Sequence, residues 1–179
     1  MEKTLVLIKP DGVGRKLVGE ILSRFERSGL KIEALKMVIP PRDLLEKHYP
    51  TTDEWFSKVG RKVLDLYKKQ KIDPKAELGS SNLLKIGKLV KKWTVDYLAS
   101  GPVIAMILSG YHAVENTRKL CGYTYPFTAD VGSIRGDFCL DSPLYANIEK
   151  RAVKNLVHAS ESHSEAGREI DLWFPEFKI

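Results

Sequence analysis

The sequence is poor in the residues that stabilise small secreted domains or bind zinc. Its 179 residues include two cysteines, Cys121 and Cys139, which are too few for a disulfide framework and do not form a CxxC pair. The histidines are also few and mostly scattered, at His48, His112, His158 and His163. A zinc site would need more cysteines or a tight histidine cluster, so these counts predict no metal site built by the protein itself.

Long apolar runs are absent as well. The longest, "PVIAMIL" at 102–108, is far too short to cross a bilayer. The first residues, "MEKTLVLIKP", lack the basic start, apolar stretch and small-residue cleavage site of a signal peptide. Hydrophobic residues make up 43% of the chain, which is enough for a core. We therefore expect a soluble, cytoplasmic protein with one domain over residues 1–179 and no membrane partner.

The charge balance is basic, with a formal net charge of +6 and a pI near 9.2. A surplus of lysine and arginine favours anionic partners such as nucleotides, nucleic acid, phosphorylated metabolites or anionic lipid. The alternative is a set of lysine-rich helices with solvated faces, which stretches such as "KVLDLYKKQK" would form. Composition alone leaves both interpretations open.

Compact apolar runs closed by proline, aspartate or glycine predict four strands. These runs lie at 4–9, 30–39, 102–110 and 137–141. Residues 122–136, "GYTYPFTADVGSIRG", show neither a helical nor a strand period and are predicted to be a long loop. Loops of this length inside compact domains are often functional.

Apolar residues at helical spacing predict the helices between these strands. The predicted helices cover 16–29, 42–49, 113–122 and 143–154. The lysine-rich stretch 54–100 is predicted to be helical in pieces, broken at Asp73-Pro74 and at Gly79-Ser80-Ser81. Ser162 and Glu165 lie three apart in a capping box, which predicts a further helix beginning near His163.

The order strand–helix–strand, strand–helix–strand is that of a split βαβ unit. It predicts a ferredoxin-like sandwich of the α+β class, in which helices cover one face of a four-stranded antiparallel sheet.

The first candidate for chemistry is Lys9, at the end of the strand predicted over 4–9. Gly12 and Gly14 follow it, but "IKPDGVGRKLVGE" fits neither the P-loop nor the dinucleotide-binding pattern. A lysine at a strand end directs its charge toward the place where the sheet opens, although it could simply reach solvent. Arg118 and Arg135 flank the long loop, with the hydroxyl of Thr124 between them. Each alone could be a surface residue, whereas together they could clamp a polyphosphate.

The second candidate is His158, where "NLV" meets the polar "SES". A neutral imidazole becomes a nucleophile when a carboxylate holds its tautomer and orientation. Asn155 and Ser160 lie near it in sequence, and Glu169 lies on the next helix. The alternatives are a buried structural histidine and a solvated glutamate.

Five short blocks lie along the chain in a fixed order. They are "IKPDGV" (8–13), "LVGEI" (17–21), "SGPV" (100–103), "IRGDF" (134–138) and "NLVHAS" (155–160). Together they resemble the nucleoside diphosphate kinase family, over most of residues 3–49 and 97–173. A single block is weak evidence, but five in the family's order are specific. The family's ferredoxin-like fold agrees with the predicted order of elements.

The resemblance implies a role for each matching residue. His158 resembles the family's phosphorylated nucleophile, and Ser160 and Glu169 resemble the pair that orients its imidazole. Tyr49 resembles a tyrosine close to the histidine and the phosphate. The positions that resemble the family's nucleotide-binding groups are Lys9, Arg118, Thr124, Arg135 and Asn155.

The resemblance also implies the reaction and its partners. The γ-phosphoryl group of a nucleoside triphosphate passes to the histidine and then to a nucleoside diphosphate, in a ping-pong cycle. Mg²⁺ is held mainly by the nucleotide phosphates and needs no protein cage. The chain is expected to form a homo-oligomer, either a tetramer or a hexamer.

The sequence departs from the family at two insertions, about 50–92 and 141–152, both expected to be helical. The first replaces the path that carries the family's base-stacking aromatic. The aligned position is Val90, and Phe56 and Trp93 are the alternatives. Two smaller departures are Glu161, in place of the usual aspartate, and Tyr125, in place of the usual asparagine.

Two further interpretations compete with a kinase. A basic ferredoxin-like domain could bind nucleic acid on its sheet, but "TLVLIK" and "PVIAMIL" lack the stacking aromatics of such domains, so a nucleic-acid partner is not expected. A non-catalytic relative would have lost the histidine or the lysine, and both are present.

Overall fold

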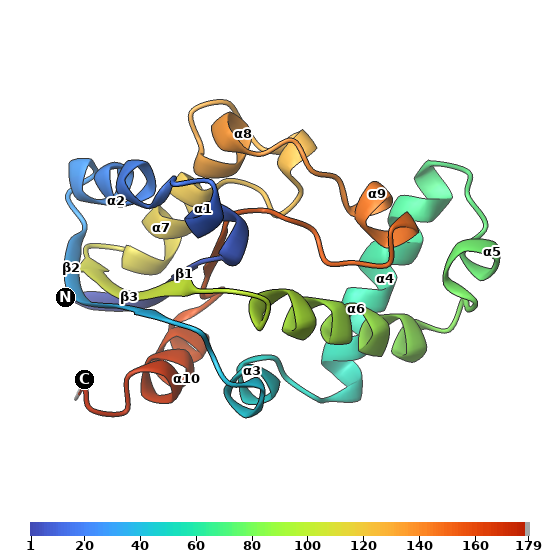
Figure 1. Cartoon of the computed structure of the whole chain (residues 1–179), viewed down its shortest axis with the longest axis horizontal. Coiled ribbons are helices and arrows are strands. Elements are labelled where there is room, and N and C mark those ends of the chain that lie inside the picture. The colour runs from blue at the N-terminus through green and yellow to red at the C-terminus, as the bar shows by residue number, and fades with distance from the viewer. Residues whose placement is uncertain (178–179) are drawn as a thin grey trace.

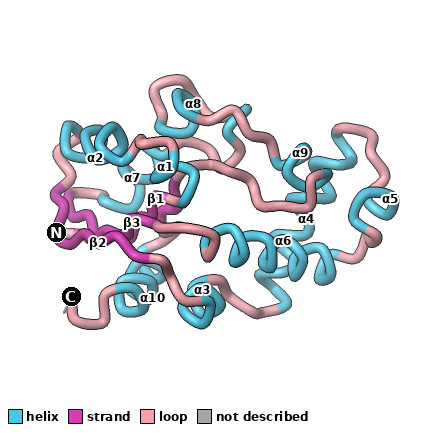
Figure 2. The backbone as a smooth tube through the Cα atoms, viewed as in Figure 1, coloured by secondary structure: helices cyan, strands magenta, loops and turns pink. Residues whose placement is uncertain are grey.

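A four-stranded antiparallel sheet forms the framework of the fold (Figures 1 and 2). The structure is a computed structural model and describes residues 1–177 of the chain. The strands are β1 (Glu2–Ile8), β2 (Lys31–Val38), β3 (Val103–Gly110) and β4 (Val157–Ala159). Their spatial order, β2-β3-β1-β4, is that of a ferredoxin-like sheet, and the predicted fold class is confirmed.

The fourth strand is not the one predicted at 137–141. That stretch lies at the end of a short helix, α8 (Ile134–Phe138), and Cys139 follows it. The Ser133 hydroxyl caps this helix by accepting a hydrogen bond from the Gly136 N–H. Ile134 and Phe138 are one helical turn apart and both pack into the core, so the short apolar run follows a helical period. The fourth strand is β4, which places His158 opposite Leu7 of β1.

Helices cover both faces of the sheet, not one face as predicted. On one face lie α2 (Val18–Arg27) and α7 (Ala113–Cys121), and on the other lie α3 (Arg42–His48) and α10 (His163–Trp173) (Figure 1). Alternate residues of β1 enter the two cores, and every residue of β3 is buried. A strand with a continuous apolar run is typical of a sheet buried on both sides. β3 therefore offers no open surface on which a nucleic acid could lie.

The lysine-rich stretch forms helices with the breaks that the sequence predicts. They are α4 (Asp53–Lys69), α5 (Pro74–Leu78) and α6 (Leu83–Leu98). Asp73 caps α5, Gly79 ends it at a positive φ of 69°, and Asn82 caps α6. Among residues 1–177, none of the helices combines the length and the apolar character needed to cross a bilayer.

The remaining helices are short. They are α1 (Pro10–Gly14), the 3-10 helix η1 (Pro126–Thr128) inside the predicted loop, and α9 (Pro143–Ile148). The helix predicted over 143–154 is therefore too long, because the chain turns at Lys150, which has a positive φ of 55°. The helix predicted near His163 begins there, with the Ser162 hydroxyl accepting the Glu165 N–H.

The two predicted insertions pack against each other. Val63 and Tyr67 of α4 and Ile86 of α6 form a small core, and Leu144 of α9 packs against it. Figure 1 shows α4, α5, α6 and α9 gathered at the end of the molecule away from the β2 edge. These helices thus form one unit, which we call the insertion unit, with a core separate from the two cores of the sheet.

The insertion unit depends on a close crossing of α4 and α6 at two glycines. A Cβ atom on Gly60 would lie 2.2 Å from the Leu83 carbonyl oxygen, and one on Gly87 would lie 2.2 Å from the Phe56 carbonyl oxygen. We expect Gly60→Ala to lower the free energy of unfolding by about 1–3 kcal/mol, because the helices must separate. Urea denaturation measures this change.

Gly19→Ala is the matched control, because it lies in α2 and a Cβ there would meet nothing within 4 Å. We expect it to raise the free energy of unfolding by about 0.5–1 kcal/mol through the helix propensity of alanine. Equal effects of the two substitutions would contradict the close crossing.

Candidate active site

A cavity of about 830 Å³ opens beside the C-terminal end of β1 and is bounded on the far side by the insertion unit. Its lining includes eight of the nine residues selected from the sequence, namely Lys9, Tyr49, Arg118, Thr124, Arg135, Asn155, His158 and Glu169. The ninth, Ser160, is fully buried and bonded to Glu169. The fold thus brings together residues from both ends of the chain.

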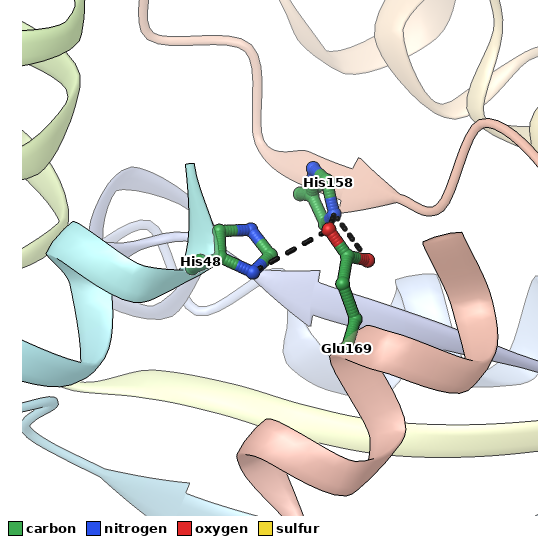
Figure 3. A group of neighbouring side chains, drawn as sticks. All are labelled: His48, His158 and Glu169. Carbon is green, nitrogen blue, oxygen red and sulfur yellow. Dashed lines mark hydrogen bonds and ion pairs between the residues drawn. The ribbon is translucent and has the colours of Figure 1, made fainter. Parts of the chain in front are cut away.

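His158 extends from β4 toward a buried carboxylate on α10 (Figure 3). Its Nε2 lies 3.1 and 3.0 Å from the two carboxylate oxygens of Glu169. An ionised carboxylate only accepts hydrogen bonds, so Nε2 carries a proton, and in the neutral tautomer the lone pair is on Nδ1. The Ser160 hydroxyl donates to Glu169 at 2.7 Å and fixes the carboxylate in turn.

Glu169 stays ionised although it is only 1% exposed. Burial by itself raises the pKa of this carboxyl, but His158, His48 and the Ser160 hydroxyl lower the pKa to about 2. The buried charge therefore persists at neutral pH and can stabilise positive charge on the imidazole of His158.

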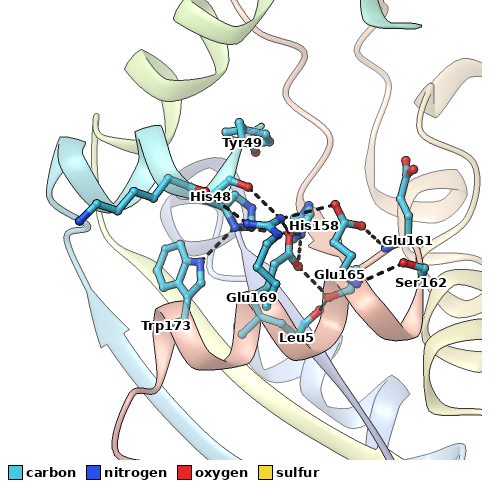
Figure 4. Close-up of polar contacts among 12 residues, drawn as sticks. Leu5, His48, Tyr49, His158, Glu161, Ser162, Glu165, Glu169 and Trp173 are labelled. Carbon is cyan, nitrogen blue, oxygen red and sulfur yellow. Dashed lines mark hydrogen bonds and ion pairs between the residues drawn. The ribbon is translucent and has the colours of Figure 1, made fainter. Parts of the chain in front are cut away.

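His48 is a member of this cluster that sequence reasoning missed. It lies on α3, its ring centroid is 4.6 Å from that of His158, and its Nδ1 accepts the Trp173 indole N–H at 3.2 Å (Figure 4). Burial, with the nearby His158, lowers the pKa of His48 to about 3, so its imidazole is neutral. One feature of the sequence does indicate that His48 is buried. It lies three residues after Leu45, on the same face of α3.

A chain of hydrogen bonds links Lys9 to the long loop. The Lys9 ammonium donates to the Asn155 side-chain oxygen at 2.6 Å, and the Asn155 amide donates to the Thr124 carbonyl at 2.9 Å. Burial and the nearby Arg135 lower the pKa of Lys9 to about 8. The ammonium is therefore still charged at pH 7, and its desolvation makes it a strong partner for an anion.

The two arginines differ in their surroundings. Arg135 is buried, and its guanidinium donates to the carbonyls of Gly122, Asn155 and Val157 at 2.7, 3.2 and 2.7 Å. Arg118 is exposed on α7 and lines the cavity. Arg135 thus organises the backbone on which the cavity is built, whereas Arg118 is held less firmly.

Comparison with known proteins identifies the family of the chain that carries these residues. The family model for nucleoside diphosphate kinase matches residues 2–60 and 85–179. The chain belongs to the nucleoside diphosphate kinase family. It is therefore an enzyme, a phosphotransferase that acts on nucleotides, as predicted from the five blocks.

The relatives match along nearly the whole chain. A nucleoside diphosphate kinase of Pyrobaculum aerophilum is 50% identical over 179 residues, which cover 100% of this chain and 98% of that protein. A crystal structure of an NDP kinase from Pyrobaculum aerophilum has a TM-score of 0.94, with 97% of this chain and 95% of that chain covered at 50% identity. A Borrelia burgdorferi enzyme, solved as a transition-state mimic with vanadate and ADP, has a TM-score of 0.75 at 35% identity, covering 97% of this chain and 86% of that chain.

The family model leaves residues 61–84 unmatched, and these residues lie inside the insertion predicted over 50–92. Part of the cavity wall comes from the insertion predicted over 50–92, and three of these residues were not selected from the sequence. Trp55, Lys58 and Lys62 of α4 line the cavity, and the Lys58 ammonium lies 3.1 Å from Glu161 on the opposite side. Val90 and Trp93, weighed as base-stacking positions, also line it. Phe56 is buried at 6% exposure and contacts Trp55.

The cluster of His48, His158 and Glu169 offers ligand atoms within 4.8 Å of one another. Two imidazoles and one carboxylate suit a transition metal better than Mg²⁺, which prefers six oxygen ligands. The cavity around His158 is also lined by the cationic side chains of Lys9, Arg118 and Arg135, which do not favour an unaccompanied Mg²⁺ ion.

The buried ionised Glu169 also predicts how stability depends on pH. Its pKa is lowered from 4.5 to about 2, so its contribution to stability is complete above pH 4.5 and is lost as the pH falls toward 2. This contribution is about 3 kcal/mol. We expect Glu169→Gln to be less stable than wild type at pH 7 and to lose less stability on acidification from pH 5 to pH 2. Urea denaturation at several pH values across this range tests the prediction. An equal loss of stability in the two proteins between pH 5 and pH 2 would contradict an ionised Glu169.

Proposed function

We propose that this chain transfers the γ-phosphoryl group of a nucleoside triphosphate to a nucleoside diphosphate through a phosphorylated His158. The observation that carries the proposal is the pairing of His158 Nε2 with the buried Glu169, which leaves Nδ1 as the nucleophilic nitrogen. His158 lines a cavity whose walls carry Lys9, Arg118 and Arg135. A nucleophile beside cations is what phosphoryl transfer requires.

In the first half-reaction, the Nδ1 lone pair attacks the γ-phosphorus and the bond to the β,γ-bridging oxygen breaks. The nucleoside diphosphate leaves with that electron pair. No proton is transferred, and the imidazole becomes a positively charged phosphohistidine whose Nε2–H remains bonded to Glu169. In the second half-reaction, an oxygen of another diphosphate attacks the same phosphorus and Nδ1 leaves. Ser160 holds Glu169, which stabilises the charge on the ring in both steps.

The other residues bind and orient the substrate. The ammonium of Lys9 and the guanidinium groups of Arg118 and Arg135 neutralise the phosphates, and the Thr124 hydroxyl donates to them. Asn155, with Lys9, contacts the sugar hydroxyls. Tyr49 supports the histidine, with its ring 6.5 Å from that of His158. Mg²⁺ would be held by the nucleotide phosphates and would supply further charge neutralisation there.

We assign the base-stacking surface to Trp55. It is half-buried, lines the cavity, and lies 6.1 Å from the Tyr49 ring. Stacking of a base on an aromatic ring is worth about 1–3 kcal/mol. We therefore expect Trp55→Ala to raise the KM for nucleoside diphosphates about 10-fold or more, with little change in kcat.

A steady-state comparison with Tyr145→Ala tests this assignment. Tyr145 is 65% exposed on α9 and lies outside the cavity lining, so its removal is expected to leave KM unchanged. An unchanged KM in Trp55→Ala would mean that the base stacks elsewhere.

Two properties of the whole molecule complete the proposal. The chain is cytoplasmic, which the two free cysteines support because reduced thiols are typical of that compartment. It assembles as a homo-oligomer, a tetramer or a hexamer. Exposed apolar side chains on and beside the edge strand β2, at Leu35, Met37 and Ile39, favour a partner there.

Label transfer from γ-labelled ATP tests the mechanism. The purified protein is expected to take up one phosphoryl group per chain in an acid-labile, base-stable form, on the peptide that contains His158. Unlabelled GDP should then release the label as GTP. Label on another residue, or label that GDP does not release, would contradict the proposed intermediate.

A further inference from the structure

A second cluster of metal-ligating side chains lies at the end of β1 remote from Lys9. Glu2 is the first residue of β1, His112 immediately precedes α7, and Glu115 lies in the first turn of that helix. One ligand atom from each of the three lies within 4.8 Å of the others. His112 and Glu115 are exposed, so an ion can reach the cluster from solvent.

The carboxylate of Glu2 is held in place before any ion binds. Its Oε1 accepts the Val114 N–H at 2.7 Å, and its Oε2 lies 3.0 Å from Nε2 of His163. Its side chain is 18% exposed. Each oxygen keeps a further lone pair, because a carboxylate has about four acceptor positions. Ligands that are fixed by outer partners in this way are typical of metal sites.

His112 adopts a backbone conformation that is uncommon for a residue with a side chain. Its φ of 49° and ψ of 46° lie in the left-handed region, and its side chain makes no capping hydrogen bond to α7. This conformation persists only where the surrounding structure enforces it. The imidazole is thus carried at a rigid junction and is not used to terminate the helix.

We propose that Glu2, His112 and Glu115 bind a divalent transition-metal ion of the Zn²⁺ type, with His163 as the residue that positions Glu2. One imidazole nitrogen and two carboxylate oxygens supply three ligands and leave a fourth position for water. The imidazole favours zinc over Mg²⁺ or Ca²⁺, which prefer oxygen ligands. The counts of cysteine and histidine predicted no such site, because its members come from distant parts of the chain.

The position of the site suggests a structural role for the ion. It would join the start of β1 to the first turn of α7 and, through His163, to the start of α10. The helix α7 carries Arg118, and α10 carries Glu169. An ion at this junction would stabilise the two helices without touching a nucleotide.

Calorimetric titration of the full chain with Zn²⁺ tests the site. We expect one ion per chain in wild type and in His158→Gln, which removes a ligand of the other histidine cluster. His112→Asn should weaken binding by more than about 100-fold, while asparagine keeps the tolerance for a left-handed backbone. Glu115→Gln, at an exposed helix position, should do the same, and His163→Asn should weaken binding by about 10–100-fold. Zn²⁺ should raise the Tm of wild type but not of His112→Asn.

Three results would overturn the proposal. The first is wild-type protein that binds no Zn²⁺. The second is His112→Asn and Glu115→Gln variants that bind it as tightly as wild type. The third is binding that disappears in His158→Gln, which would assign the ion to His48, His158 and Glu169. None of these measurements depends on kinase activity.

Discussion

His158→Gln is expected to lower kcat by about 10⁴-fold or more, because an amide nitrogen is not nucleophilic and the phosphoryl group then has no imidazole to accept it. Glutamine is the informative replacement because its amide N–H can still donate to Glu169. The buried carboxylate therefore keeps a hydrogen-bond partner. The loss should therefore reflect chemistry and not unfolding. Steady-state assays of phosphoryl transfer from ATP to GDP measure it.

Two controls accompany this variant. Its free energy of unfolding in urea should stay within about 1 kcal/mol of wild type, and its affinity for ADP should be little changed, because Lys9, Arg118 and Arg135 remain. A variant that retains more than about one per cent of the wild-type kcat would show that another group accepts the phosphoryl.

Arg135→Met is expected to lower the free energy of unfolding by about 3–5 kcal/mol and also to abolish most activity. The guanidinium donates to two buried carbonyls, at Asn155 and Val157, and to the partly buried carbonyl of Gly122, and methionine satisfies none of them. These carbonyls belong to the loop and strand that surround His158. Urea denaturation measures the loss of stability, and Arg135→Lys should give an intermediate loss because one ammonium cannot reach all three carbonyls.

Arg118→Met separates binding from stability. Arg118 is exposed, and within residues 1–177 it shows no hydrogen bond or ion pair with another side chain. We expect the free energy of unfolding of this variant to change by less than about 0.5 kcal/mol, while kcat/KM falls because a phosphate contact is lost. If Arg135→Met were as stable as Arg118→Met, the three carbonyl contacts would not support the fold.

The strands and long helices could be predicted because each has a strong local pattern. Apolar runs closed by proline or glycine identify β1, β2 and β3, and Asp73-Pro74 and Gly79 divide the lysine-rich stretch correctly. The fourth strand was misplaced because both candidates are short apolar runs. Pairing with β1 decides between them, and a pairing partner across the fold leaves no local signal. Coverage of both sheet faces could have been read from the continuous apolar run of β3.

The residues around His158 were identified from short blocks that keep their spacing. The geometry brings eight of the nine into one cavity. The residues that were missed lie outside these blocks, between the second block and the third. In sequence, His48 resembles any buried helix residue. Trp55, Lys58 and Lys62 line the cavity from α4, which packs against α6. Such crossings depend on the Gly60 and Gly87 contacts, which no sequence spacing reveals.

The link between Lys9 and Asn155 has a consequence for the timing of folding. These residues are 146 positions apart, and β4, the strand that carries His158, is only three residues long and pairs with β1, which is distant from it in sequence. Contacts between distant segments form late, because a large loop must close first. A growing polypeptide can therefore form three strands of the sheet before His158 and Glu169 are in place. The pairing of His158 with Glu169 can form only after β4 and α10 have both been added to the chain and α10 has packed against the sheet.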